Sequence, residues 1–186
     1  MSIDSRQMHT NTRLGADARL LEEAFRHCVE LYTEVASGTG EASTLPVLAY
    51  ATSDACTAAA RLSAIVDFPV PEGPLLSPVI FDADPMRRGL ANALQGIDTY
   101  YEVDMPRGDP TDPTRAPEIV EASITDDILT AVSAMQTGLY LLDQGRPAEA
   151  MWWWQYSCLS SWGERITSAL HVIQTILSQA RASDSF

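Results

Sequence analysis

The histidines, cysteines and serines of this sequence are the side chains that could supply a nucleophile and its base. Nucleophilic catalysis needs a serine or cysteine held next to a histidine. His9 lies in a polar N-terminal stretch, and His27 and His171 lie beside polar positions of amphipathic helical patterns. Because the sequence has no G-x-S-x-G turn and no catalytic cysteine context, we interpret these histidines as solvated or partly buried and predict no catalytic triad.

The adjacent carboxylates Asp126 and Asp127 could hold a hard cation only if further oxygens converged on them. A helical metal site repeats a Glu-x-x-His pattern or carries an H-E-x-x-H pair, and the sequence contains neither. Two aspartates at a helix start are explained by the helix dipole alone. Glycine-rich phosphate loops are also absent, so we predict no metal and no other cofactor.

Cys28, Cys56 and Cys158 lie far apart within apolar helical patterns, and none belongs to a C-x-x-C pair. We interpret them as small buried hydrophobic residues. The stretch MSIDSRQMHTNTR at the N-terminus has no apolar core, and no run of about 18 apolar residues occurs in the chain. We therefore predict neither a signal peptide nor a membrane span, and a location in the reducing cytoplasm.

The composition is that of an acidic globular protein. The chain has 186 residues, 46% hydrophobic and 20% charged, which fits one domain with one core. Its formal net charge is -13, from 25 acidic against 12 basic residues, and every basic residue is arginine. Such a field repels phosphate groups, so direct binding of nucleic acid or of an anionic membrane is disfavoured.

Tryptophan is the remaining feature that could form a site. Trp152, Trp153 and Trp154 are consecutive, and Trp162 follows eight positions after the last of them. Successive side chains of a helix diverge by about 100°, so three neighbouring indoles cannot all enter one core. We expect Trp152, Trp154 and Trp162 in the core. We expect Trp153 on a polar face, where a proline-rich loop covers it or a partner binds it.

Helical periodicity indicates how these residues are positioned. Apolar side chains recur at spacings of three and four over residues 16–37 and 45–66. A further helix is expected to begin at the aspartates before Pro85 and to end near Glu102. Small alanine side chains in the second of these helices favour close packing of a neighbouring helix.

The C-terminal half continues the same pattern. Ser123 and Asp126 have the spacing of a capping box at a helix start. The helix that begins there has a predicted packing seam of apolar residues at alternating spacings of four and three: Ile128, Val132, Met135, Leu139 and Leu142. Residues 144–147 form a turn between antiparallel helices. Residues 147–181 then form one long helix, bent or briefly broken at Gly163, which we expect at the centre of the bundle.

No segment alternates convincingly with a period of two residues, so the sequence predicts an all-α fold. We expect a single-domain bundle of five or six helices with long proline-rich loops over 67–78 and 99–117. The bundle would span residues 16–182, between a flexible N-terminal tail (1–15) and a flexible C-terminus (183–186).

The C-terminal hundred residues resemble an uncharacterised, actinobacterial-type family of all-helical bacterial proteins, a domain of unknown function. In that family a paired-aspartate helix start is followed by a G-x-x-x-x-A turn, by W-x-W-x-[FY]-S and by W-G. The matching residues here are Asp126, Asp127, Gly145, Ala150, Trp152, Trp154, Tyr156, Ser157, Trp162 and Gly163. The resemblance implies an all-helical fold and carries no activity, substrate or established site.

We expect a non-catalytic cytoplasmic protein that presents an acidic surface with an aromatic patch to another protein. The residues predicted to form that surface are Tyr101, Glu102, Trp153, Ser157 and Glu164.

Two alternatives stay open. The first is a small-molecule binder or enzyme with a pocket between helices, walled by Trp152, Trp154 and Trp162. Its polar groups would be Glu102, Gln155 and Arg165. The second is a homodimer sealed through the same patch.

Overall fold

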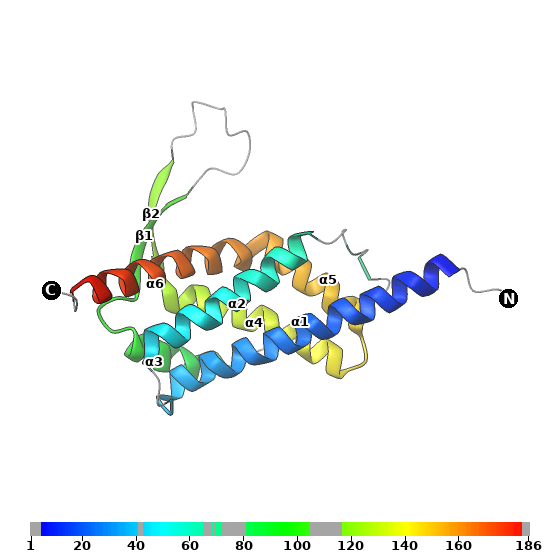
Figure 1. Ribbon diagram of the computed structural model, residues 1–186, viewed down its shortest axis with the longest axis horizontal. Helices are drawn as coiled ribbons and strands as arrows, with labels where there is room; N and C mark the ends of the chain where they lie inside the picture. The colour runs from blue at the N-terminus through cyan, green and yellow to red at the C-terminus, as the bar shows by residue number, and fades with distance from the viewer. Residues whose placement is uncertain are drawn as a thin grey trace.

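The computed structural model of the chain describes residues 5–40, 43–64, 68, 70–71, 81–104 and 117–183. Within these residues, six α-helices and one antiparallel hairpin form the fold (Figure 1). The elements are α1 (Ser5–Ser37), α2 (Thr44–Ala64), α3 (Asp84–Ala93), β1 (Thr99–Asp104), β2 (Glu118–Ser123), α4 (Ile124–Asp143), α5 (Pro147–Ser157), the π-helical turn η1 (Cys158–Trp162) and α6 (Gly163–Ser183). The predicted all-α bundle is confirmed.

Helix α4 is the centre of the bundle. It packs against α1, α3, α5 and α6, and most of its residues are buried, including the predicted seam from Ile128 to Leu139; the last seam residue, Leu142, is half-buried. Helix α6, in contrast, buries only Ile166, Ala169 and Ile173. The expectation that the tryptophan-bearing segment is the central helix is therefore wrong, because α4 packs against more of the other elements than α5 or α6 does.

Helices α1 and α2 run antiparallel side by side (Figure 1). Small side chains of α2, among them Ala51, Ala55 and Ala58, are buried and allow the close approach that the sequence predicts. Helix α1 begins at Ser5 rather than near Ala16. It ends where Gly38 adopts a positive φ of 65°, a conformation that glycine tolerates best.

The largest departure from the predicted fold follows α3. This helix ends at Ala93, not near Glu102, and residues 99–104 form strand β1. Strand β1 pairs with β2 in a register that joins Thr99 to Ser123 and Asp104 to Glu118. The expectation that the chain has no strand is therefore wrong, and the hairpin stands out from the helices (Figure 1).

The predicted bend at Gly163 is confirmed, and its cause is a π-helical turn. The Gly163 N–H bonds to the Cys158 carbonyl, five residues earlier, so η1 carries more residues per turn than the helices on either side. A Cβ on Gly163 would lie 2.7 Å from that carbonyl oxygen, so this turn requires glycine.

Two predicted local signals are also confirmed. The Ser123 side chain caps α4 by accepting a hydrogen bond from the Asp126 N–H at 3.2 Å. Gly145, with φ of 71°, turns the chain into α5. Of the expected loop over 67–78, only Phe68 and residues 70–71 are among the described residues. In the second expected loop, residues 105–116 also lie outside the described residues.

Three free cysteines lie within the helices: Cys28 and Cys158 are buried, as predicted, whereas Cys56 is only half-buried. Burial raises the pKa of the Cys28 thiol to about 12 and that of Cys158 to about 11. Among the described residues, no helix combines the length and the apolar character needed to cross a membrane.

Candidate functional site

Trp154 and Trp162 belong to the core, as predicted. Both are fully buried and make edge-on contacts with Phe25 of α1, at ring-centroid distances of 4.8 and 6.0 Å. The Trp154 indole N–H donates to the Met135 carbonyl and that of Trp162 to the Ser157 hydroxyl, each at 3.1 Å. Because both N–H groups are satisfied internally, the two rings stabilise the bundle.

Trp153 does not lie on a polar face. Its side chain is half-buried against the core, and its N–H donates to the Ala134 carbonyl of α4 at 3.1 Å. Ser157, expected beside it on the surface, is buried and donates to the Trp153 carbonyl at 2.7 Å, whereas Glu164 is exposed. The expectation that Trp153 lies on a polar face is therefore wrong, because α4 covers a wider arc of α5 than the helical pattern indicates.

Trp152, expected in the core, is only half-buried. It stacks on Tyr156 with the ring centroids 5.2 Å and the planes 7° apart. Tyr156 and Leu159, which share its helix face, are 55% and 60% exposed. The burial predicted for Trp152 is thus wrong in degree, because α5 buries the neighbouring arc that contains Met151 instead.

Of the residues predicted to form a pocket between the indoles, Trp154, Trp162 and Gln155 are buried and hydrogen-bonded within the fold. Gln155 is buried, its Oε1 accepts from the Phe68 N–H at 2.9 Å, and its Nε2 donates to the Leu62 carbonyl at 3.1 Å. Its amide therefore joins the chain after α2 to α5. Of the other predicted polar groups of that pocket, Glu102 lies on β1. Arg165 lies on α6 and contacts Asp127 near the base of the hairpin.

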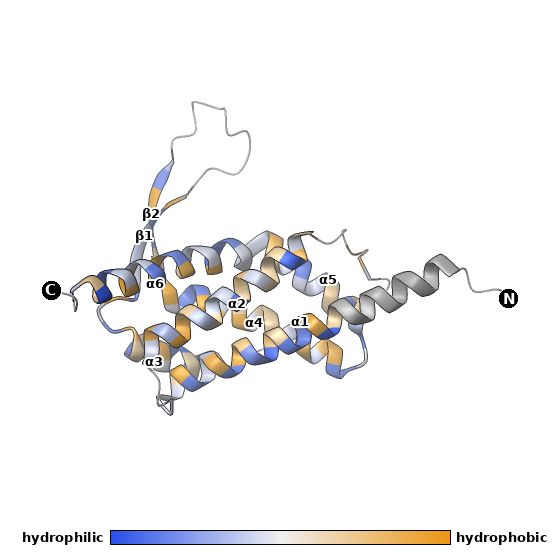
Figure 2. Cartoon of the chain, viewed as in Figure 1, coloured by the Kyte–Doolittle hydropathy of each residue, from blue (hydrophilic) through white to orange (hydrophobic). Residues whose placement is uncertain are grey.

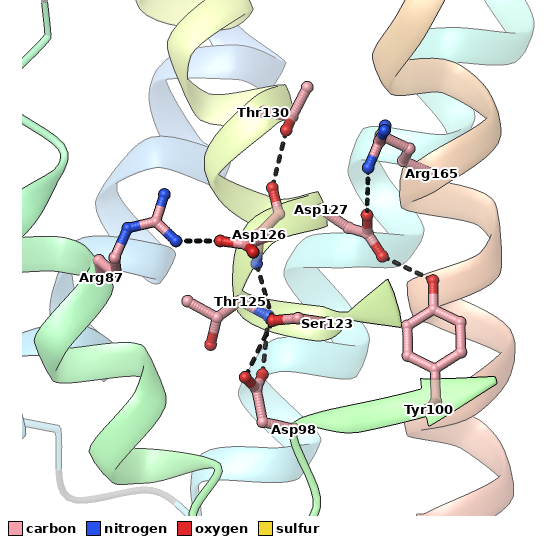
Figure 3. Close-up of polar contacts among 9 residues, drawn as sticks. All are labelled: Arg87, Asp98, Tyr100, Ser123, Thr125, Asp126, Asp127, Thr130 and Arg165. Atoms are coloured by element: carbon pink, nitrogen blue, oxygen red, sulfur yellow. Dashed lines mark hydrogen bonds and ion pairs between the residues drawn. The ribbon is translucent and has the colours of Figure 1, made fainter. Parts of the chain in front are cut away.

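A buried carboxylate joins the base of the hairpin to two helices (Figure 3). Asp127 of α4 is 1% exposed and accepts a hydrogen bond from the Tyr100 hydroxyl of β1 at 2.6 Å. Its other oxygen lies 3.3 Å from Nη1 of Arg165 of α6. We name Tyr100, Asp127 and Arg165 the latch, since their contacts hold β1, α4 and α6 together.

A second carboxylate fixes the same corner (Figure 3). Asp98, just before β1, accepts from the Ser123 hydroxyl at 2.9 Å and from the Thr125 N–H at 2.8 Å. The exposed Asp126 forms an ion pair with Arg87 of α3. The paired aspartates thus have different roles, since Asp126 bonds on the surface and Asp127 bonds inside.

The latch alters the acidity of its members. Burial raises the pKa of Asp127, and hydrogen bonds from Tyr100 and Arg165 oppose that rise. Burial also raises the pKa of Tyr100, and the negatively charged carboxylate that accepts its hydrogen bond raises that pKa further. Tyr100 is therefore a protonated donor at neutral pH.

The hairpin has one inner and one outer face. Tyr100 faces the helices and is buried, whereas Tyr101, Val103 and Ile119 are 70%, 57% and 76% exposed. Val103 lies opposite Ile119 across the ladder, and Tyr101 lies opposite Glu121, to which its hydroxyl donates at 3.3 Å. Tyr101, Val103, Ile119 and Glu121 form the outer face of the hairpin.

Carboxylates lie on both faces of the hairpin. Glu121 shares the outer face, whereas Glu102 and Glu118 alternate to the opposite face, where Glu118 is exposed and Glu102 is half-buried. Figure 2 shows hydrophobic and hydrophilic residues on the strands that leave the bundle. The outer face is therefore an apolar patch with one carboxylate, on a hairpin that carries further acidic residues.

Sequence reasoning identified Tyr101 and Glu102 but missed Val103 and Ile119, as well as the burial of Asp127. The signal was the clustering of Val103, Ile119 and Val120 with tyrosines, residue types that favour strands. Among the described residues, no group of three or more His, Cys, Asp or Glu side chains could hold a metal ion.

These features define a class of protein: an all-α bundle that carries a projecting hairpin anchored by a buried aspartate. The chain belongs to the family described as a domain of unknown function (DUF5063), whose model matches residues 17–179. The comparisons with curated proteins and with solved structures gave no match.

Proposed function

We propose that this protein is a non-catalytic interaction module that binds another protein through the outer face of the hairpin. The observation that carries the proposal is the exposure of Tyr101, Val103 and Ile119 together on one projecting element. Apolar side chains that gather on one surface are typical of interaction sites. A two-stranded hairpin also leaves backbone groups at its edges that can pair with a partner.

The acidic side chains of the hairpin indicate which partner would fit. Glu121 on the outer face, with Glu102 and Glu118 on the opposite face of the same strands, favours a protein whose apolar pocket is flanked by lysine or arginine. A second copy of this chain is a poor match, since two acidic hairpins would repel each other and the chain as a whole carries a net charge of -13.

A site-specific crosslinker tests the proposal in the native cell. A photoreactive residue placed at Ile119 should capture a defined protein, whereas one at Tyr156, which is also exposed, should not capture the same protein. Capture of this chain alone from position 119 would indicate a homodimer and would overturn the proposal.

The captured protein is then purified and titrated against matched variants. Val103→Ser with Ile119→Ser removes two apolar contacts and should weaken binding at least about tenfold. Tyr156→Ser with Leu159→Ser removes a similar exposed pair elsewhere and should leave the affinity unchanged. Equal weakening by both pairs would contradict a specific role of the hairpin.

A further inference from the structure

A groove of about 680 Å³ runs between α1 and α2, on helices that take no part in the hairpin. Its α1 side carries Glu23, His27 and Glu30, whose spacing of four and three residues places them on one helix face. Its α2 side carries Asp54 and Arg61.

The groove has an apolar component. Leu20, Ala24 and Ala58 line it, and Leu20 remains 54% exposed although it is a large hydrophobic residue. Tyr50 of α2 is 55% exposed and contacts the His27 ring at 5.9 Å. Small alanine side chains let the backbone of an incoming helix approach closely, and the exposed leucine offers it an apolar contact.

The charges of the groove are unbalanced. Glu23, Glu30 and Asp54 form no ion pair in the described part of the chain, while Arg61 is the one lining cation outside an ion pair. Arg26, the other arginine of the lining, is already bound to Glu22 at 3.0 Å and to Asp143 at 2.8 Å. The groove therefore attracts positive charge along its α1 side.

We propose that this groove binds a basic amphipathic helix of a partner protein. The apolar stripe of that helix would lie on Leu20 and Ala24, and its lysine or arginine side chains would face Glu23 and Glu30. Binding of an amphipathic helix in a groove is an established mode of peptide recognition. A second copy of this chain fits poorly, because it contains no lysine and is strongly acidic.

The probe is a labelled synthetic peptide of about 18 residues, built from leucine, alanine and lysine with the leucines on one helical face. A scrambled peptide of the same composition has the same charge without the apolar stripe. Fluorescence anisotropy at low salt should show tighter binding of the amphipathic peptide. Equal binding of both peptides would show unspecific attraction to an acidic protein and would overturn the proposal.

Matched variants locate the binding site. Glu23→Gln with Glu30→Gln should weaken binding of the amphipathic peptide about fivefold, since two charge pairs are removed. Glu118→Gln with Glu121→Gln makes the same change of charge on the hairpin and should have less than about a twofold effect. A larger effect of the hairpin pair than of the groove pair would place the peptide on the hairpin and overturn the proposal for the groove. A peptide that does not bind the groove would also overturn this proposal, and the function proposed for the hairpin would be unaffected.

Discussion

The variant Tyr100→Phe removes one hydroxyl from the latch and changes little else in shape. In the wild type this hydroxyl donates to the buried Asp127 carboxylate at 2.6 Å. In the variant the carboxylate stays buried and keeps Arg165 at 3.3 Å, whose side chain is 53% exposed and therefore screened by water. The variant isolates the contribution of one hydrogen bond to a buried charge.

At neutral pH the free energy of unfolding should fall by about 1.5 to 3 kcal/mol, the usual contribution of a hydrogen bond to a charged group. The phenyl ring remains in place, so the loss of packing is small. We expect the upper part of this range, because Asp127 is only 1% exposed and water cannot replace the lost donor.

The size of this loss should depend on pH. Because burial raises the pKa of Asp127 above its unfolded value, the folded state prefers the neutral carboxyl. The stability that this group contributes is therefore present at low pH and lost as the pH rises through its folded pKa. The Tyr100 hydrogen bond lowers that pKa, so its removal costs most when the carboxyl is charged. The difference between variant and wild type should shrink as the pH falls through the titration of Asp127.

Urea denaturation followed by circular dichroism, at about pH 7 and at about pH 4, measures the loss in the free energy of unfolding and its dependence on pH. Tyr101→Phe is the matched control, since its hydroxyl contacts Glu121 on the exposed face of the same strand. We expect it to change stability by less than about 0.5 kcal/mol. If Tyr100→Phe cost no more than Tyr101→Phe, or cost the same at both pH values, the latch would not stabilise the fold as argued.

Three further variants test the packing around α4. Trp153→Phe removes the N–H that bonds to Ala134 and should cost about 1 to 2 kcal/mol in urea denaturation, whereas a surface indole would cost almost nothing. Gly138→Ala would place a Cβ 2.0 Å from Nε1 of Trp154 and should lower the free energy of unfolding by about 1 to 3 kcal/mol. An unchanged melting temperature would contradict this predicted clash. Ser123→Ala removes the α4 cap and should cost about 0.5 to 2 kcal/mol; thermal unfolding equal to wild type would show that the cap is dispensable.

Local signals predicted much of the bundle correctly. The start of α4 at Ser123, the turn at Gly145 and the bend at Gly163 depend on backbone geometry that neighbouring residues determine. The buried seam of α4 follows from helical periodicity in the same way. Such features need no knowledge of what the element packs against, which is why the sequence alone identifies them.

The hairpin shows where local reasoning fails. Apolar residues at helical spacing continue from Leu90 through Leu94 and Ile97 to Tyr101, so the pattern extends α3 past its real end. Strand formation at β1 depends instead on pairing with β2, which follows a segment rich in proline and aspartate. Pairing between distant segments gives only a weak signal in the sequence of each segment. Six residues are too few for strand alternation to outweigh a helical pattern.

The prediction of which indoles are buried fails for a related reason. A helical projection gives the angle between Trp152, Trp153 and Trp154 correctly, but it does not say how many neighbours surround the helix. With α4 alongside, α5 buries Trp154 and half-buries both adjacent rings, so the predicted divergence is real and yet leaves no fully exposed indole. Exposed aromatic and aliphatic side chains lie instead on the outer face of the hairpin, at Tyr101, Val103 and Ile119. The docking surface proposed for the hairpin therefore depends on which element projects from the bundle, more than on which segment is richest in tryptophan.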